Sequence, residues 1–297
     1  VINNFPYQDI RDYYAKWYRP DLQGIMIVGD INVDEMEAKL KKVFADIKAP
    51  VNPAERIYYP VADNQEPQIF IGTDKEIETP SISFFFKSEA FPDSLKNTIN
   101  YYGIQYMLSM GVTMLNSRLA EISQQANPPF TGASAGYGDF FVAKTKNAFG
   151  VDASSKIDGI ELAMKTILEE TERARRFGFT ETEYDRARAN YLQRVESAYN
   201  EREKMKNDTY VNEYISHFLD NEPMPGIEYE YAMMNQLAPN IPVAAINQVM
   251  QQLITDNNQV VLLAGPEKEG LKYPTKEEIA ALLKQMKSFD LKPYEDK

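Results

Sequence analysis

Hydrophobic positions along the chain follow two spacings, one of which predicts helices and the other strands. Apolar residues three and four positions apart indicate helices, and short runs of β-forming residues indicate strands. The predicted helices cover 7–18, 32–47, 94–108, 113–124, 157–178, 180–219, 242–253 and a last segment that carries Ile279, Leu282, Leu283 and Met286. The predicted strands cover 25–28, 68–72, 81–87, 130–137, 140–143 continuing into 148–153, and 259–263.

Several helix ends carry capping residues. Asn32 with Glu35, and Thr180 with Glu183, have the spacing of a capping box, in which two side chains and two backbone amides bond reciprocally. Gly178 is placed to end the helix before it. The pattern from Thr180 to Leu219 is long for one helix, which predicts two helices or one bent helix.

One plan of helix, polar turn, β-run and glycine occurs twice, at 10–30 and at 246–266. Aligned without gaps, the two segments share Ile10 with Ile246, Gln23 with Gln259 and Gly29 with Gly265. A repeat of this length suggests a duplicated domain. The order of elements predicts an α+β fold, a mainly antiparallel sheet with helices packed on one face.

The repeat also predicts where the domains divide. Residues 1–50 are interpreted as the C-terminal part of a preceding homologous lobe, and 68–297 as one complete lobe. Between them, 51–67 is rich in proline, which fixes φ and removes a backbone donor, so this stretch is predicted to be a linker.

The composition of the chain argues against several classes of function. The 297 residues carry a net charge of −12, and nucleic-acid binding is disfavoured because phosphate recognition needs clustered Lys and Arg. The chain has no cysteine, which excludes disulfides and thiolate chemistry. No apolar run reaches the ~20 residues that span a bilayer. The first residues lack the pattern of a signal peptide, although this carries no weight if the chain is a fragment.

Candidate chemistry is sparse. His217, the one histidine, has Glu213 and Asp220 at helical spacing, and one His with two carboxylates could in principle complete a zinc site. A histidine on a helix surface or half-buried is the favoured interpretation. Adjacent carboxylates such as Glu201 and Glu203 favour a solvated face, and an independent carboxylate-based hydrolase is therefore a weak alternative. The many Phe and Tyr residues fit core packing better than a peptide-binding chamber.

Several segments resemble one known family. The segment YYAKWYRPDLQGIMIVGDINVDEMEAKLKKVFADI resembles the end of the catalytic domain in pitrilysin/insulinase-type zinc metallopeptidases. The segments SRLAEISQQANPPFTGASA, TETEYDRARANYLQRVESA and NQVVLLAGP, which start at 117, 180 and 258, resemble successive parts of the domain that follows it. The resemblance covers nearly the whole chain in the family's order, and it implies a LuxS/pitrilysin-like α+β lobe.

The resemblance implies that zinc chemistry lies elsewhere in a parent protein. The family's H-x-x-E-H motif would lie upstream of Val1, so no cofactor is expected in this chain and zinc is expected in the preceding lobe. There a carboxylate would activate a zinc-bound water for attack on a peptide bond. The implied partners are that catalytic lobe, or a homologous subunit, and a peptide substrate, with no nucleic acid.

The family also has an Arg and a Tyr that assist catalysis from another lobe. Ala120 and Phe130 stand at the corresponding positions, and neither can hydrogen-bond a developing oxyanion. This chain therefore resembles the non-catalytic second lobe. Arg118 lies one position early, and a structural pairing with Glu121 at i+3 is its simplest explanation. The candidates for contact with substrate in a chamber are Arg118, Glu121, Phe130 and Tyr137.

We therefore expect part of the chamber wall of a zinc-dependent peptidase, inactive by itself. The alternative is a scaffold or assembly subunit of the same fold, in a parent protein without peptidase activity. The resemblance implies that an extended peptide adds to a sheet edge, without identifying the strand. The sequence does not identify the cellular compartment, and the bacterial periplasm and the cell envelope are among the candidates.

Overall fold

The structure is a computed structural model that describes residues 4–296, and the chain divides into two compact units. Unit 1 joins the residues up to Ile57 with Glu201–Pro225. Unit 2 joins Tyr58–Asn200 with the residues from Gly226 onward. Unit 2 holds the sheet and most of the buried side chains, and it positions the candidate site.

Unit 2 is built on a sheet with the strand order β1-β5-β2-β4-β3. β1 runs parallel to β5, and the other neighbours are antiparallel. The predicted α+β class with a mainly antiparallel sheet is therefore confirmed. The strands are β1 (Gln68–Asp74), β2 (Ser81–Glu89), β3 (Gly132–Asp139), β4 (Lys146–Ser154) and β5 (Gln259–Pro266).

The β3–β4 hairpin differs in part from its prediction. β3 begins and ends two residues later than expected, and β4 begins at Lys146. Residues 140–143 were predicted as strand, which is wrong, because they form the turn of the hairpin and Phe141 has a positive φ of 55°. Residues 140–142 are all apolar, which is typical of a strand. The chain must turn here, however, because β4 pairs antiparallel to β3.

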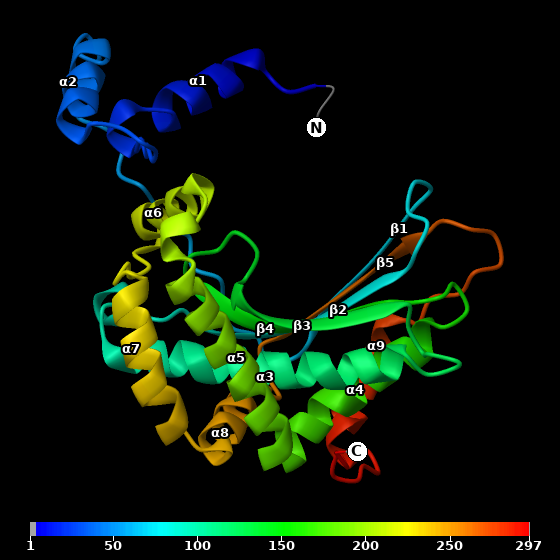
Figure 1. The fold of residues 1–297 in the computed structure, drawn as a ribbon. Helices are drawn as coiled ribbons and strands as arrows, with labels where there is room; N and C mark the ends of the chain where they lie inside the picture. Colours follow the sequence, from blue (N-terminus) through cyan, green and yellow to red (C-terminus); the bar gives the residue numbers. More distant parts are fainter. Residues whose placement is uncertain (1–3, 297) are drawn as a thin grey trace. The chain divides into compact units, whose positions relative to one another are not determined.

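The helices of unit 2 cover one face of the sheet, as Figure 1 shows for α3, α4, α8 and α9. α5 and α7 form an outer layer, in which α5 packs against both α3 and α7. Helices on one face only are the arrangement that the sequence predicted. The helices are α3 (Ile99–Ser123), α4 (Ile160–Phe177), α5 (Glu181–Asn200), α7 (Ile227–Leu237), α8 (Val243–Leu253) and α9 (Lys276–Gln285).

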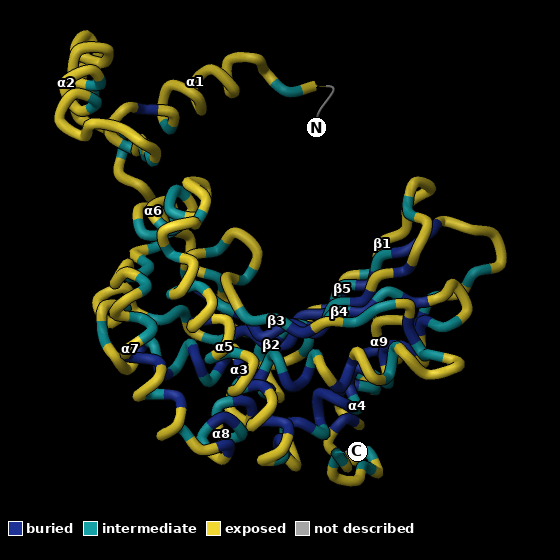
Figure 2. The backbone as a smooth tube through the Cα atoms, viewed as in Figure 1, coloured by how far each residue is buried: buried dark blue, intermediate teal, exposed yellow. Residues whose placement is uncertain are grey.

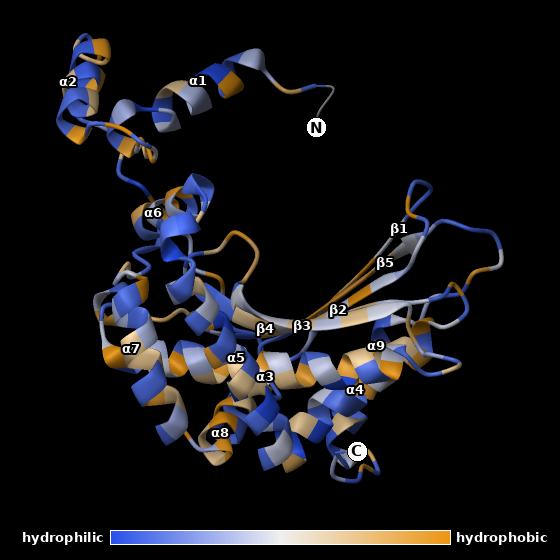
Figure 3. Ribbon diagram, viewed as in Figure 1, coloured by the Kyte–Doolittle hydropathy of each residue, from blue (hydrophilic) through white to orange (hydrophobic). Residues whose placement is uncertain are grey.

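The core lies between the sheet and these helices, where Figure 2 shows the buried backbone in dark blue. Along β2, Ile82, Phe84 and Phe86 are buried and alternate with partly exposed residues, as expected for a strand with one face on the core. Phe84 lies opposite Val151 of β4 and Val261 of β5, both also buried. Figure 3 shows the resulting hydrophobic runs along β1 and β5.

α3 is one continuous helix of 25 residues, so the predicted division into 94–108 and 113–124 is wrong. Thr98 caps its start by accepting a hydrogen bond from the Tyr101 N–H. Gly111 lies inside the helix at a point where a Cβ would collide with the side chain of Met250 on α8. The glycine permits a close approach of two helices.

Unit 1 contains three α-helices among its described residues, α1 (Tyr7–Trp17), α2 (Val33–Val43) and α6 (Asn207–Asp220). Asn32 caps α2 by accepting from the Glu35 N–H, and α2 ends before Ile47. The predicted strand 25–28 is not formed, because the described part of unit 1 offers no strand to pair with it. The pattern from Thr180 to Leu219 gives two helices, α5 and α6.

No helix within residues 4–296 combines the length and the apolar composition that crossing a bilayer requires.

Candidate functional site

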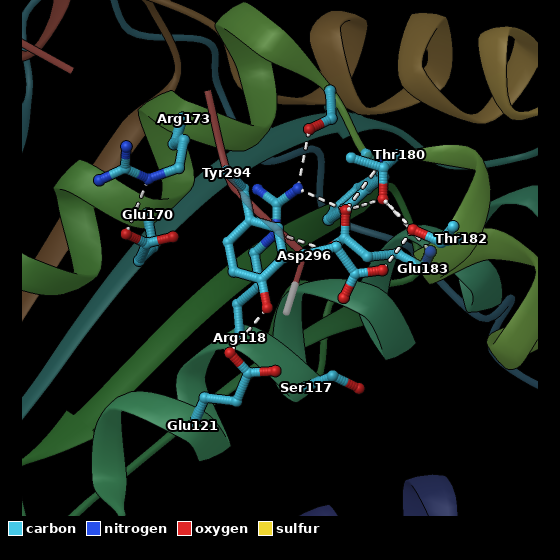
Figure 4. Close-up of polar contacts among 12 residues, drawn as sticks. Ser117, Arg118, Glu121, Glu170, Arg173, Thr180, Thr182, Glu183, Tyr294 and Asp296 are labelled. Atoms are coloured by element: carbon cyan, nitrogen blue, oxygen red, sulfur yellow. Dashed lines mark hydrogen bonds and ion pairs between the residues drawn. The ribbon is translucent and has the colours of Figure 1, made fainter. Parts of the chain in front are cut away.

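Arg118 is the centre of the largest polar cluster around the predicted site residues (Figure 4). It extends from α3, and only 1% of its surface is exposed. Its Nε donates to Glu183 Oε1 at 2.7 Å, and its Nη2 donates to Glu183 Oε2 at 2.8 Å and to the Gly178 carbonyl at 2.9 Å. This side-on geometry is the strong form of an Arg–carboxylate pair. It joins α3 to the start of α5.

Glu183 has a second task at the same place. Its carboxylate accepts from the Thr180 N–H at 2.8 Å, and its own N–H donates to Thr180 Oγ1 at 3.2 Å. These are the two reciprocal bonds of the capping box that the sequence predicted. One carboxylate therefore closes the helix start and compensates a buried arginine.

Two aromatic rings enclose the Arg118 guanidinium. Its Cζ lies 4.6 Å from the ring centre of Phe179 and 4.3 Å from that of Tyr294. A guanidinium stacked between ring faces keeps a favourable electrostatic environment when it loses water. Tyr294 comes from the C-terminal segment that follows α9, so this segment covers the buried ion pair.

The predicted pairing of Arg118 with Glu121 is wrong. The two residues are close along α3, but Arg118 turns toward Glu183 on α5. Glu121 instead accepts a hydrogen bond of 2.7 Å from the Tyr294 hydroxyl. Burial raises the pKa of Tyr294, and the bond to Glu121 raises it further, so the hydroxyl keeps its proton and acts as the donor.

The C-terminal segment is held at further points. Asp296 pairs with both terminal nitrogens of Arg186 at 2.7 Å and accepts a bond from Thr182. The Arg186 hydrogen bonds come first in lowering the pKa of Asp296 to about 2. Arg176 of α4 donates to the Lys287 and Phe289 carbonyls, at 2.7 and 2.9 Å. Residues 286–296 therefore form a strap, fastened mainly by arginines.

The other predicted residues lie apart from this cluster. Phe130 is fully buried in the hydrophobic core. Tyr137 on β3 is half-buried, and its hydroxyl accepts from Asn147 Nδ2 at 3.2 Å. The structure thus brings Arg118 and Glu121 together through Tyr294, and it does not bring Phe130 or Tyr137 to them. In this conformation Arg118 and Phe130 have almost no surface with which to touch a peptide.

Sequence reasoning missed the strap and the partners of Arg118. Glu183 could have been found from the sequence, because the capping-box spacing from Thr180 predicts that its side chain has a fixed position at the start of a helix. Tyr294 and Asp296 could not have been found in this way. They lie in a short segment after the last helix, where no hydrophobic periodicity predicts how the chain packs.

His217 lies in unit 1, and its Nδ1 is 2.7 Å from the Glu222 carbonyl oxygen. A ring nitrogen that bonds a backbone carbonyl carries the proton, so it is not a metal ligand in that state. Within residues 4–296, no three His, Asp or Glu side chains are grouped so that they could hold a metal ion.

Comparison with known proteins identifies the family. The family model described as the peptidase M16 inactive domain matches residues 4–191. The chain belongs to this family.

Two curated relatives have similar sequences. A protein named zinc protease PQQL-like from Arabidopsis thaliana is 27% identical over 268 residues, which are 90% of this chain and 25% of that protein. The probable zinc protease PqqL of Escherichia coli is 24% identical over 246 residues, 82% of this chain and 26% of that protein. The chain therefore spans about a quarter of each of these relatives.

Solved structures share the fold. The periplasmic protease PqqL from Escherichia coli superposes with a TM-score of 0.82 and 21% identity, over 99% of this chain and 32% of that one. A structure of the first half of the same protease gives a TM-score of 0.81 and 21% identity, over 97% of this chain and 61% of that one.

Proposed function

We propose that this chain is the non-catalytic second lobe, with the tail of the first, of a zinc-dependent peptidase that degrades or processes peptides. It forms part of the substrate chamber wall and positions the catalytic lobe. The match to an inactive domain and the relatives named as zinc proteases support this proposal. Residues 1–50 belong to the preceding lobe, 51–67 to a linker and 68–297 to the second lobe.

The observation that carries the proposal is the bare apolar surface of α1 and α2. Both helices are amphipathic, yet neither buries a single residue. An amphipathic helix normally packs its apolar side against other structure. A preceding lobe would supply that cover. The large apolar side chains left exposed on and beside these helices include Tyr7, Ile10, Tyr13, Tyr14, Tyr18, Ile31, Val33, Val43, Phe44 and Ile47.

The four candidate residues divide into two groups under this proposal. Glu121 is exposed and Tyr137 is half-buried, so they are the two that could touch a peptide directly. Arg118 and Phe130 are buried and would support the wall from inside. The zinc belongs to the upstream lobe, where the family's H-x-x-E-H motif would hold it and activate water.

The test compares the isolated chain with the parent protein that contains the upstream residues. We expect stoichiometric zinc and chelator-sensitive cleavage of unstructured peptides in the parent, and neither in the isolated chain. Zinc-dependent cleavage by the isolated chain that is lost in His217→Ala would overturn the proposal. A parent that binds no zinc and cleaves nothing would instead favour the scaffold alternative.

A further inference from the structure

One part of unit 1 comes from the middle of the second lobe's sequence. Glu201–Pro225, called the α6 arm below, lies in the chain between α5 and α7 of unit 2. It nevertheless groups with the residues up to Ile57 as one compact unit. Under the proposed function those residues include the tail of the preceding lobe. The second lobe therefore contributes a helix to the unit that contains its neighbour's tail.

The α6 arm is held together by its own hydrogen bonds. The Tyr210 hydroxyl donates to the Arg202 carbonyl at 3.0 Å, which fixes the segment before α6. His217 Nδ1 donates to the Glu222 carbonyl at 2.7 Å, which fixes the segment after it. Between them α6 ends at Asn221, whose φ of 54° is the left-handed conformation of a helix C-cap. The arm is thus an ordered piece with a defined shape.

A close contact joins the arm to the tail of the preceding lobe. The Phe218 ring lies directly on the backbone of Gly24, and a Cβ built on this glycine would be 3.1 and 3.2 Å from two ring atoms. Those distances are shorter than the usual contact between carbon atoms, so the absence of a side chain at Gly24 is what lets the ring approach.

A second contact shows how α6 lies on the tail. At the start of α6, Asn207 Nδ2 would be 3.8 Å from a Cβ added at Gly29. The helix from Asn207 to Phe218 and an extended chain from Gly24 to Gly29 are equally long, about 17 Å at the usual rise per residue of each. α6 therefore runs antiparallel along residues 24–29, the β-forming run that closes the first copy of the repeat.

The exposure of α6 is the reverse of what a surface helix shows. Its apolar residues form one stripe at helical spacing, and each is 38% to 53% exposed. This α6 stripe consists of Tyr214, Ile215, Phe218 and Leu219. The polar residues of the same turns, which are only partly exposed, are Glu213, Ser216, His217 and Asp220. Because a helix normally covers its apolar side and leaves its polar side to water, the α6 stripe is a surface for a partner.

The surface beside the stripe belongs to the preceding lobe's tail. Phe218 takes part in both, since its ring touches Gly24 while 48% of the side chain is exposed. Ile25 and Ile27 of the adjacent run are exposed as well. Under the proposed function this run lies within the preceding lobe, and the residues of that lobe that cover it come to lie next to α6.

We propose that the α6 arm docks the second lobe onto the preceding lobe. Phe218 is its anchor on Gly24, and the α6 stripe packs on residues of that lobe that lie upstream of Val1. The partner is a neighbouring lobe of the same protein and not a substrate. This inference rests on the assignment of the tail to a preceding lobe, and it requires neither zinc nor peptide cleavage.

The first measurement tests the anchor by the NMR shifts of the Gly24 Hα protons in the chain. An aromatic ring in contact displaces nearby protons from the values of an unstructured glycine. We expect this displacement in wild type and in the control Tyr214→Leu, and its loss in Phe218→Leu, which keeps an apolar side chain. Gly24 signals at unstructured values in wild type, or unchanged in Phe218→Leu, overturn the proposal.

The second measurement tests the partner by hydroxyl-radical labelling, read by mass spectrometry. The rates at Tyr214 and Phe218 are compared between the isolated chain and the parent protein that contains the upstream residues. Both side chains should be oxidised several-fold more slowly in the parent, because the preceding lobe covers them. Equal rates in the two proteins overturn the proposal, and this comparison needs no variant.

Two variants that add the same charge to α6 provide the matched control. Leu219→Glu lies on the stripe, and Thr209→Glu lies on the opposite, polar side, where the residue is also exposed. In the parent, Leu219→Glu should raise the oxidation of Tyr214 to the rate of the isolated chain, whereas Thr209→Glu should leave it unchanged. In the isolated chain both should leave it unchanged. Equal effects of the two variants in the parent contradict the docking.

Zinc content and peptide cleavage of the same parent sample test the proposed function separately. A parent that binds no zinc but protects the stripe contradicts the proposed function and supports the docking. An active parent with an unprotected stripe does the reverse.

Discussion

Arg118 and Glu183 form a side-on ion pair, with both N–O distances below 3 Å, although 65 residues separate them in the chain. Both side chains are almost completely buried. A buried pair of this kind gains little over a well-packed apolar pair, but an unpaired buried charge is costly. The pair therefore makes the α3–α5 contact specific, because either residue without the other would be a buried charge that nothing compensates.

Glu183→Gln tests this pair. The amide keeps an acceptor for the helix cap and removes the charge that compensates Arg118. We expect the free energy of unfolding to fall by about 3–5 kcal/mol, the usual cost of leaving one buried charge alone. Urea unfolding followed by circular dichroism measures it. Asp185→Asn is the matched control, because it breaks the more exposed pair with Arg188 on the same helix and should cost ~0.5 kcal/mol. Equal losses in the two variants would contradict the interpretation.

The strap should loosen in acid through Asp296. Its pKa in the folded state is about 2, below the usual 3.8 of an aspartate, because the hydrogen bonds from Arg186 stabilise the carboxylate. A lowered pKa contributes stability that is complete above pH 3.8 and is lost as the pH falls through about 2. We expect the NMR signals of the Tyr294 ring to move toward those of a free tyrosine in this window. In Asp296→Asn the ring signals should be shifted already at neutral pH, and a wild-type spectrum for this variant would exclude the mechanism.

Local features of the fold were predictable from the sequence. The capping box of Thr180 and Glu183 uses residues three apart, and the end of α4 at Gly178 needs one residue, so neither depends on the rest of the chain. The alternation of β2 reports its buried face directly. The family resemblance added the lobe itself, which the match to the inactive-domain model bears out.

Features that depend on distant partners were not predictable. The predicted division of α3 into 94–108 and 113–124 is wrong, because the helix continues through Gly111, which packs against Met250 of α8. The β-run at 25–28 has the right composition and no strand to pair with among the described residues of unit 1. Arg118 was assigned the nearest carboxylate in sequence, Glu121, whereas α5 brings Glu183 closer in space.

Tyr294 makes two separable contributions, which two variants distinguish. Tyr294→Phe removes the bond to Glu121 and keeps the ring on Arg118, and because Glu121 is exposed and can bond water, we expect a loss of about 1 kcal/mol or less. Tyr294→Ala also uncovers Arg118 and should cost roughly 2 kcal/mol more, the value of a desolvated cation–π contact. Thermal unfolding of both variants beside wild type gives the values. If the two variants were equally stable, the ring would not protect the ion pair.

Gly178 should tolerate no side chain. Its φ of 71° with ψ of −160° is a conformation that glycine adopts and other residues avoid. A Cβ would also collide with the carboxamide of Asn247, which bonds the Phe179 N–H at 2.7 Å and the Phe179 carbonyl at 3.1 Å. We expect Gly178→Ala to lower the free energy of unfolding by roughly 1–3 kcal/mol from the backbone alone, and more through the displaced Asn247.

Gly159→Ala is the control for this prediction. Gly159 precedes α4 with a φ of −112°, and its nearest neighbour to an added Cβ is the Lys156 carbonyl oxygen at 3.6 Å, an ordinary contact. Loss of a glycine at this helix start should cost about 1 kcal/mol or less. Because the Gly178 carbonyl accepts a hydrogen bond from Arg118 Nη2, the Ala variant should in addition broaden the NMR signal of the Arg118 Nη2 protons. A Gly178→Ala protein as stable as Gly159→Ala, with that signal unchanged, would show that the junction of α4 and α5 relaxes without strain.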